Sequence, residues 1–246
     1  QVLEQRPQRV FLGHKGDVVD LAWSQTSFLC SASLDQTVIL WHTSRRIDQL
    51  CAFRHARFVT SVDFHPLYDQ LFLTGCTDSK LRLWNVENKR VLNWVQCPEM
   101  ITTAKFSPDG QLAVVGLLDG RVMFYHTKDL KYYTQIHCRN RHGSKRKGKK
   151  VTGLAFISSS QLRELRTLGW GVGGSGHGPG SGHGPLEPGS AGMASKKDSM
   201  GSLYHLLSTT NDSRLRLYDL DSFCMVGKGL VWVGEGVTGV GGGGIP

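Results

Sequence analysis

TDSKLRLWNV at residues 77–86 and NDSRLRLYDL at residues 211–220 are nearly the same phrase. Both place an aspartate six residues before an aromatic side chain, and this pair occurs twice more in the chain. The four pairs are Asp35 and Trp41, Asp78 and Trp84, Asp119 and Tyr125, and Asp212 and Tyr218. The aspartates are 43, 41 and 93 residues apart. Two of these spacings match a repeat of about 40–45 residues, and the third equals one repeat with about fifty inserted residues.

Every repeat contains the same order of short strand patterns around its aspartate. A first segment alternates apolar residues, a second ends in small residues, and a third carries the aromatic side chain. The first segments are 18–23, 60–65, 102–107 and 151–156, and the second segments are 28–33, 71–76, 112–116 and 205–209. Fourth strands are predicted near 47–53, 89–95 and 131–136. Because turn residues such as Ser107-Pro108-Asp109-Gly110 separate the segments, each repeat predicts a four-stranded antiparallel blade, and the chain an all-β fold.

These repeats resemble WD40 repeats, since Gly13-His14 matches the Gly-His opening of that family and the four aromatic residues stand at its Trp-Asp position. The resemblance implies a β-propeller of which about four blades are visible, as part of a seven-bladed ring. It also implies a buried chain of hydrogen bonds in each blade, from a histidine through a hydroxyl and the turn aspartate to the aromatic side chain. The residues expected in this network are His14, Ser31, Asp35 and Trp41, then His55, Thr74, Asp78 and Trp84, then Asp119 with Tyr125, and last Ser208 and Asp212 with Tyr218. The third blade has Val115 at the hydroxyl position, and His137 or His142 is the expected donor in the fourth.

The composition divides the chain into five parts. Residues 1–12 are predicted to contain the last strand of a preceding blade, at 7–12, and residues 13–168 to form blades one to three and the start of blade four. The chain has 30 glycines, and most of them lie at 169–192 and from Gly227 onward. We therefore expect a disordered glycine-rich insertion at 169–202, the remainder of blade four at 203–226, and an irregular glycine-rich tail at 227–246. The missing blades and the absence of an initiator methionine lead us to expect a fragment of a longer protein.

A basic run at residues 139–150 holds seven cations and no acidic residue, whereas the remaining chain has a formal charge of only +2. Such a loop suits an acidic protein or an anionic membrane surface, and a solvated loop without a partner is the alternative. Its candidate binding residues are Lys145, Arg146, Lys147, Lys149 and Lys150. Nucleic acid is not expected as a partner, because the rest of the chain is close to neutral. The match of 143–149 to a phosphate-binding loop is accidental, since Lys150 replaces the required Ser or Thr and a strand follows.

The residue before each turn aspartate projects at one rim of a WD40 propeller, as the family resemblance implies. These residues are Leu34, Thr77, Leu118 and Asn211. They differ in size and polarity while the aspartates beside them are constant, which favours contact with a protein partner.

Catalysis is not expected, because a His, Ser and Asp set that recurs with the repeat is a structural feature and a catalytic centre occurs once. The six cysteines contain no C-x-x-C pair, so we expect no structural zinc, and we also expect no cofactor and no small-molecule substrate. No secretory signal precedes the repeats, which predicts a cytoplasmic protein or, alternatively, a nuclear one.

Segments such as LWHTSRR (40–46), FLTGCTDSKLRLWN (72–85) and STTNDSRLRLYDL (208–220) are similar to the family of WD repeat-containing protein 44, also called rabphilin-11. This resemblance implies a non-catalytic effector of a Rab GTPase, or an adaptor, in endosomal vesicle trafficking. The alternative is a nuclear WD40 adaptor that recruits substrates to a ubiquitin ligase or takes part in RNA processing, and that uses the basic loop.

Overall fold

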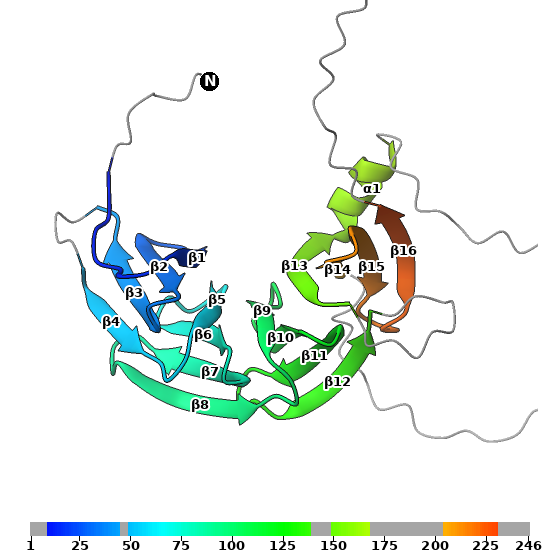
Figure 1. Ribbon diagram of the computed structural model, residues 1–246. Helices are drawn as coiled ribbons and strands as arrows, with labels where there is room; N and C mark the ends of the chain where they lie inside the picture. The colour runs from blue at the N-terminus through cyan, green and yellow to red at the C-terminus, as the bar shows by residue number, and fades with distance from the viewer. Residues whose placement is uncertain (1–8, 45–48, 139–148, 168–203, 231–246) are drawn as a thin grey trace, which may run out of the picture.

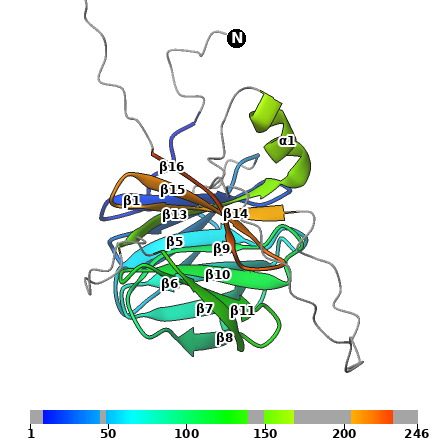
Figure 2. The ribbon, with the colours of Figure 1, turned by 90° about the vertical axis from the view of Figure 1, so that its right-hand side faces the viewer.

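The structure is a computed structural model, and it describes residues 9–44, 49–138, 149–167 and 204–230 of the 246-residue chain. Four antiparallel sheets of four strands follow one another along an arc that is open between the first and the fourth sheet (Figure 1). The predicted all-β fold with four propeller blades is therefore confirmed, and Figure 2 shows the blades from the side.

The sixteen strands of the described residues follow the repeat. Blade 1 contains β1 (Val18–Trp23), β2 (Phe28–Ser33), β3 (Thr37–His42) and β4 (Cys51–Arg54). Blade 2 contains β5 (Val59–Phe64), β6 (Leu71–Cys76), β7 (Lys80–Asn85) and β8 (Arg90–Gln96). Blade 3 contains β9 (Ile101–Phe106), β10 (Leu112–Leu117), β11 (Arg121–His126) and β12 (Tyr132–His137). Blade 4 contains β13 (Val151–Ser158), β14 (Tyr204–Thr210), β15 (Arg214–Asp219) and β16 (Met225–Leu230).

A three-residue turn with the same backbone joins the second and third strands of every blade. The N–H of its last residue donates to the carbonyl three residues earlier: Gln36 to Ser33, Ser79 to Cys76, Gly120 to Leu117, and Ser213 to Thr210. That last residue has a positive φ of 57–86° in all four blades. The aspartate before it suits this turn, because its carboxylate accepts the backbone N–H two residues later, as in Thr37 to Asp35 at 3.0 Å.

The hydrophobic core lies mainly between neighbouring blades. One cluster joins Leu40 and Phe53 of blade 1 to Val62 and Phe72 of blade 2, and similar clusters join blades 2 and 3 and blades 3 and 4. Small residues let the blades approach: a Cβ added at Gly116 of β10 would lie 2.6 Å from Cγ1 of Val151 in the next blade. Each blade therefore depends on its neighbours for burial, as expected for stacked repeats.

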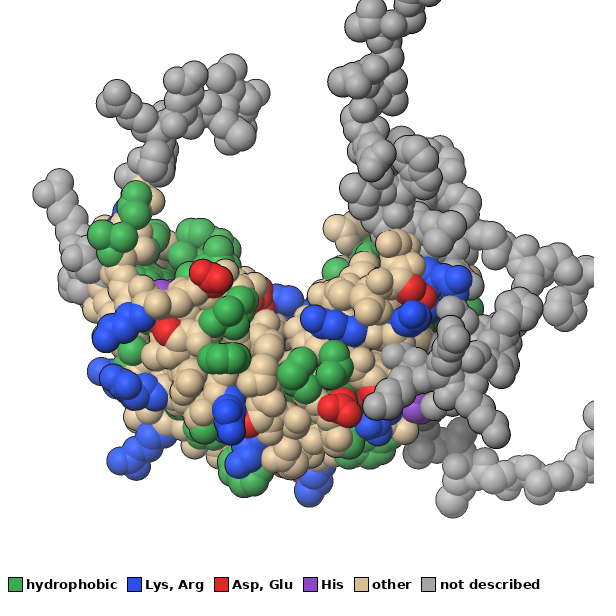
Figure 3. All heavy atoms as spheres, viewed as in Figure 1, with side chains coloured by type: hydrophobic (Ala, Val, Ile, Leu, Met, Phe, Trp, Pro, Cys, Tyr) green, Lys and Arg blue, Asp and Glu red, His purple; other side chains and the backbone are tan. Residues whose placement is uncertain are grey.

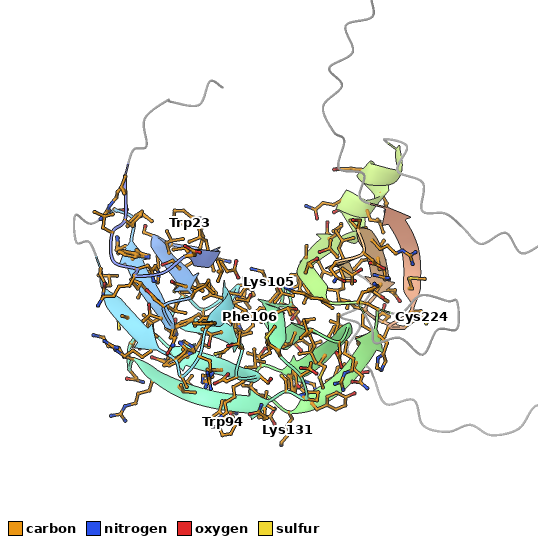
Figure 4. All side chains as sticks on the ribbon, in the orientation of Figure 1. Trp23, Trp94, Lys105, Phe106, Lys131 and Cys224 are labelled. Carbon is orange, nitrogen blue, oxygen red and sulfur yellow. The ribbon has the colours of Figure 1, made fainter. Side chains whose placement is uncertain are left out.

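Carboxylates on the innermost strands also link the blades. Asp20 accepts hydrogen bonds from the hydroxyl of Ser61 and the N–H of Val62, both at 2.9 Å. Asp63 accepts from Lys105 Nζ at 2.9 Å and from the N–H of Phe106 at 2.8 Å. Figure 4 shows Lys105 and Phe106 on β9, at the inner side of the arc. The inner strands are thus connected by directional bonds as well as by apolar packing.

Three segments differ from the sequence-based expectation. Blade 4 is completed by β16, which covers residues 227–230 of the tail that was expected to be irregular; its backbone pairs with β15, and a ladder needs no particular side chains. A helix that was not predicted, α1 (Ser159–Thr167), follows β13, and Ser158 and Gln161 form a capping box at its start. The strand predicted at 7–12 is absent from the described residues 9–12, where no ladder partner is present. The insertion at 169–202 lies outside the described residues.

Candidate functional site

The expected hydrogen-bond network is complete in blade 1. His14 contacts Asp35 Oδ2 through Nδ1 at 2.9 Å and Ser31 Oγ through Nε2 at 2.7 Å, and the indole N–H of Trp41 donates to the same hydroxyl at 2.8 Å. Asp35 also accepts the N–H of Lys15 at 2.8 Å. Burial favours a higher pKa for Asp35, but the hydrogen bonds from Thr37, Lys15 and His14 outweigh it and hold the pKa well below its usual range. The charged carboxylate therefore pins both the turn and the chain that enters β1.

In blade 2 the equivalent residues form two separate hydrogen-bonded groups. His55 and Trp84 both contact the hydroxyl of Thr74 at 2.9 Å, as expected. Asp78, however, lies 2.5 Å from Nη2 of Arg82, and Nδ1 of His55 contacts the carbonyl of Phe53 instead. The expected contact between His55 and Asp78 is therefore replaced, because a charged guanidinium on β7 is a stronger partner for the carboxylate than a neutral imidazole.

His55 is neutral in this environment. Burial is the largest cause that lowers its pKa, and the positive charge of Arg82 lowers it further, to about 4. The histidine ring therefore acts as a fixed hydrogen-bond partner of Thr74 and carries no charge near neutral pH.

Cysteines occupy the histidine position in blades 3 and 4. The backbone N–H groups of His55, Cys97 and Cys138 each donate at 2.8 Å to the last residue of the turn in the preceding repeat, namely Gln36, Ser79 and Gly120. Cys138 Sγ lies 3.5 Å from both Ser208 Oγ and Tyr218 Oη. The expected donor His137 is thus replaced by the next residue, and His142 lies outside the described residues. Sequence reasoning missed this, although Cys97 precedes Asp119 by 22 residues, much as His55 precedes Asp78 by 23.

The remaining turn carboxylates also have internal partners. Asp119 accepts from Nε of Arg121 at 2.6 Å, and Asp212 accepts from the Thr210 hydroxyl at 2.5 Å with Arg214 and Arg216 within 3.7 Å. Burial favours a higher pKa for Asp212, but Thr210 and the two arginines hold the pKa below its usual range. The network is therefore distributed over four turns, and within the described residues no cluster of His, Cys, Asp or Glu side chains could hold a metal ion.

The rim that carries these turns is the candidate functional site. We define it by the residue before each turn aspartate and by the residue immediately before the first strand of each blade. The residue before each aspartate donates its N–H to a residue just before or at the start of the first strand: Leu34 to Asp17, Thr77 to Phe58, Leu118 to Met100, and Asn211 to Lys150, at 2.9–3.0 Å. Leu34 and Leu118 are 38% and 40% exposed, Asn211 is exposed, and Thr77 is half-buried. The predicted rim residues therefore all lie at equivalent places, each beside a second residue.

Sequence reasoning missed Phe58 and Met100, which lie beside Thr77 and Leu118 on this rim. Phe58 is 48% exposed and Met100 is half-buried. Their position, immediately before β5 and β9, is the signal that could have identified them. Lys149 and Lys150 of the basic run are exposed, whereas Lys145, Arg146 and Lys147 lie outside the described residues. Figure 3 shows hydrophobic side chains over the middle of the arc and Lys and Arg side chains around its margins.

No helix among the described residues is long and apolar enough to cross a membrane. The family described as WD domain, G-beta repeat matches residues 5–42, 48–85 and 91–126, which contain most of blades 1–3. WD repeat-containing protein 44 of Xenopus laevis is 40% identical over 226 residues, which cover 90% of this chain and 20% of that protein. An uncharacterised WD repeat-containing protein of Schizosaccharomyces pombe is 37% identical over 160 residues, 64% of this chain and 26% of the relative.

A third relative, 2-deoxy-glucose resistant protein 2 of Saccharomyces cerevisiae, is 32% identical over 214 residues, which cover 87% of this chain and 22% of the relative. The chain thus spans about a fifth to a quarter of the length of these relatives. The repeated turn, the blade topology and these similarities agree, and the chain is therefore a WD40-repeat protein.

Proposed function

We propose that this chain is a non-catalytic scaffold that binds another protein through the rim of its blades. The family model that matches this chain is the WD domain, G-beta repeat, and WD40 propellers generally act as scaffolds. The observation that carries the proposal is that neighbouring rim residues have different roles. Each turn aspartate is held by internal hydrogen bonds, while the residue before it is exposed or half-buried and differs from blade to blade. Constant residues therefore hold the scaffold and variable residues face the solvent, which suits recognition of a partner.

The partner that we propose is a Rab GTPase, with the chain acting as an effector or adaptor in endosomal vesicle trafficking. The support is the resemblance to the family of WD repeat-containing protein 44, together with 40% identity to its Xenopus laevis member. The proposed location is the cytoplasm at the surface of endosomes. Lys149 and Lys150 would add an electrostatic attraction to an anionic membrane surface, as a second contact beside the protein partner.

The direct test measures binding of the 246-residue chain to a panel of purified Rab GTPases by biolayer interferometry. Each GTPase is loaded with GDP or with a non-hydrolysable GTP analogue. We expect one or more members to bind preferentially in the GTP form, and the rim variant Phe58→Asn/Leu118→Asn to bind more weakly. The matched control is Leu67→Asn, because Leu67 is 60% exposed in the connection between β5 and β6, at the opposite end of these strands.

The outcomes separate the two parts of this proposal. Equal binding of both nucleotide forms, or of no GTPase in the panel, would contradict the Rab assignment. Equal effects of the rim variant and the Leu67→Asn control would contradict the rim as the binding surface.

A second candidate function is a nuclear adaptor that recruits substrates to a ubiquitin ligase or takes part in RNA processing. The run of basic residues at 145–150 favours it, because such runs serve as nuclear localisation signals. Imaging of the tagged chain in cells distinguishes the two candidates. Endosomal puncta that persist in Lys145→Ala/Arg146→Ala/Lys147→Ala support the trafficking function, whereas nuclear signal that this variant abolishes supports the nuclear one.

A further inference from the structure

The rim of blades 2–4 is built from the same backbone hydrogen bonds in each blade. Phe58 accepts from Thr77, and two residues later Ser79 accepts from Cys97. The same two bonds recur in blade 3, where Met100 accepts from Leu118 and Gly120 accepts from Cys138. Lys150 then accepts from Asn211 in blade 4. Within the described residues, these bonds hold the rim backbone from Phe58 to Cys138, and Lys150 is held to Asn211 in the same way.

The middle of this rim is apolar. Phe58 is 48% exposed, Leu118 is 40% exposed, and Met100, whose carbonyl accepts from Leu118, is half-buried. Methionine and aromatic side chains adapt their shape to apolar groups and are enriched where proteins bind one another. All three side chains keep apolar surface in contact with solvent, which an apolar group of a partner could cover.

Exposed cations flank this apolar part. Arg57 and Lys15 lie on the side of blades 1 and 2, and Lys149 and Lys150 on the side of blade 4, and all four are exposed. No ion pair joins any of them to another residue in the described ranges. The turn carboxylates do not pair with these exposed cations, because each carboxylate already has another partner. The partners are His14, Arg82, Arg121, and Arg214 with Arg216.

Two acidic residues also lie just before first strands of the blades: Asp17 precedes β1, and Glu99 lies two residues before β9. The described part of this rim therefore has an excess of two positive charges over negative ones. A ligand with negative charge on either side of an apolar group is complementary to it.

We infer that the rim of blades 2–4 binds a short acidic segment of a partner protein, with a large apolar side chain of that segment packed on Phe58, Met100 and Leu118. The inference rests on the proposed scaffold function and specifies the chemistry of the partner. An extended segment suits this site because the blades follow one another along an arc, and acidic residues on both sides of the apolar side chain then meet Arg57 at one end and Lys149 and Lys150 at the other.

A membrane surface fits the same residues less well. A protein that docks on a bilayer buries protruding apolar side chains in the headgroup region, whereas Met100, at the centre of the three apolar residues, is half-buried. A single-stranded nucleic acid would use a longer row of cations and aromatic platforms, and this rim has one aromatic side chain, Phe58, among the residues that define it.

The test measures fluorescence anisotropy of labelled synthetic peptides with the 246-residue chain. The first peptide has glutamates on both sides of a Leu-Phe pair, the second has glutamines in place of the glutamates, and the third has serines in place of Leu-Phe. We expect the first to bind most tightly. Lys149→Ala/Lys150→Ala should weaken it about two- to thirtyfold, which corresponds to the loss of two exposed ion pairs. Raising the salt concentration should weaken it as well, since the Debye length falls from about 10 Å at 0.1 M to about 3 Å at 1 M.

The matched control is Arg90→Ala/Lys128→Ala. It also removes two exposed cations, but these lie at the start of β8 and after the end of β11, away from the rim turns. We expect it to bind the first peptide as the parent chain does. Circular dichroism of both variants should match the parent, so that a loss of binding is not a loss of fold.

Three results would overturn the inference. The first is equal binding of the glutamate and glutamine peptides, and the second is an equal effect of the two double variants. The third is tighter binding of phosphatidylserine vesicles or of oligouridylate, with the same dependence on Lys149 and Lys150, which would assign the rim to a membrane or to RNA. A Rab GTPase that needs the rim while no peptide binds would preserve the scaffold function and reject only the acidic segment.

Discussion

The carboxylate of Asp78 is paired with the guanidinium of Arg82, with Oδ2 2.5 Å from Nη2. In blade 1 the equivalent carboxylate, Asp35, contacts His14, and Ile39 occupies the position of Arg82. Both members of the ion pair are largely buried, with 13% and 15% of their side chains exposed. The turn carboxylate is therefore charged in both blades, but its partner differs: a histidine that precedes β1 in blade 1 and an arginine on β7 in blade 2.

We expect Asp78→Ala to lower the free energy of unfolding by about 1–3 kcal/mol, because the substitution leaves the Arg82 guanidinium and the N–H of Lys80 without their partner. Arg82→Met in the same chain should recover part of this loss, since the buried cation is then removed too. Urea denaturation of the two single variants and the double variant measures the coupling. Strictly additive effects would contradict the ion pair.

Stability should fall as the pH is lowered through the range in which His55 titrates. Its folded-state pKa of about 4 lies below the usual value near 6.5, so the unfolded chain binds the proton first. The contribution of His55 is therefore fully present above about pH 6.5 and is lost as the pH falls towards 4, up to about 3 kcal/mol. Urea denaturation between pH 7.5 and pH 4 measures the slope.

The control for this effect is His55→Gln, which does not titrate and keeps a side chain that can bond to Thr74. We expect a smaller pH slope in this variant between pH 6.5 and 4. Burial also lowers the pKa of His65, so part of the slope should remain. Carboxylates with lowered pKa values lose their contribution only as the pH falls below about 4, outside most of this range. They are Asp35, Asp78, Asp129, Asp212 and Asp219. An unchanged slope would contradict the neutral state of His55.

The seam between blades 3 and 4 should not tolerate an added methyl group at Gly116. A Cβ there would lie 2.6 Å from Cγ1 of Val151 and 2.7 Å from Cγ2 of Thr103, closer than van der Waals contact allows. We expect Gly116→Ala to lower the stability by about 1–3 kcal/mol, measured by urea denaturation. The control is Gly153→Ala, where a Cβ would meet only the hydroxyl of Thr209, at 2.9 Å. A smaller loss at Gly116 than at Gly153 would contradict this packing.

Thiol labelling should distinguish Cys224 from the buried cysteines. Cys224 is exposed, whereas Cys30, Cys76 and Cys97 are buried. Burial raises the pKa of Cys97 to about 11 and also raises the pKa of Cys30, so little of the reactive thiolate forms in the folded chain. At pH 8 we expect Cys224 to react first and Cys30, Cys76 and Cys97 to react only on unfolding. Iodoacetamide labelling followed by peptide mass mapping tests this order, which Cys97 reacting as fast as Cys224 would contradict.

The sequence by itself determined the repeat, the blade and the turn. Two of the signals are local: apolar residues alternate along a strand, and a tight turn favours an aspartate. Local signals can be recognised in a single amino-acid sequence. The rim residues Leu34, Thr77, Leu118 and Asn211 followed from the resemblance to WD40 repeats, once the turn aspartates were located. The capping box at Ser158 and Gln161 is also local, and it could have revealed α1 if the segment had not been assigned to a blade.

Only the tertiary structure decided which groups satisfy the buried polar atoms. Asp78 pairs with Arg82, and Cys97 and Cys138 take the place of histidine, because the partner of a buried group depends on the side chains that neighbouring strands bring to it. The ladder between β15 and β16 has the same origin, since backbone pairing across a sheet needs no sequence signal of its own in the glycine-rich segment. Phe58 and Met100 became rim residues for this reason too: their place beside Thr77 and Leu118 is set by hydrogen bonds between segments 18–19 residues apart in the chain.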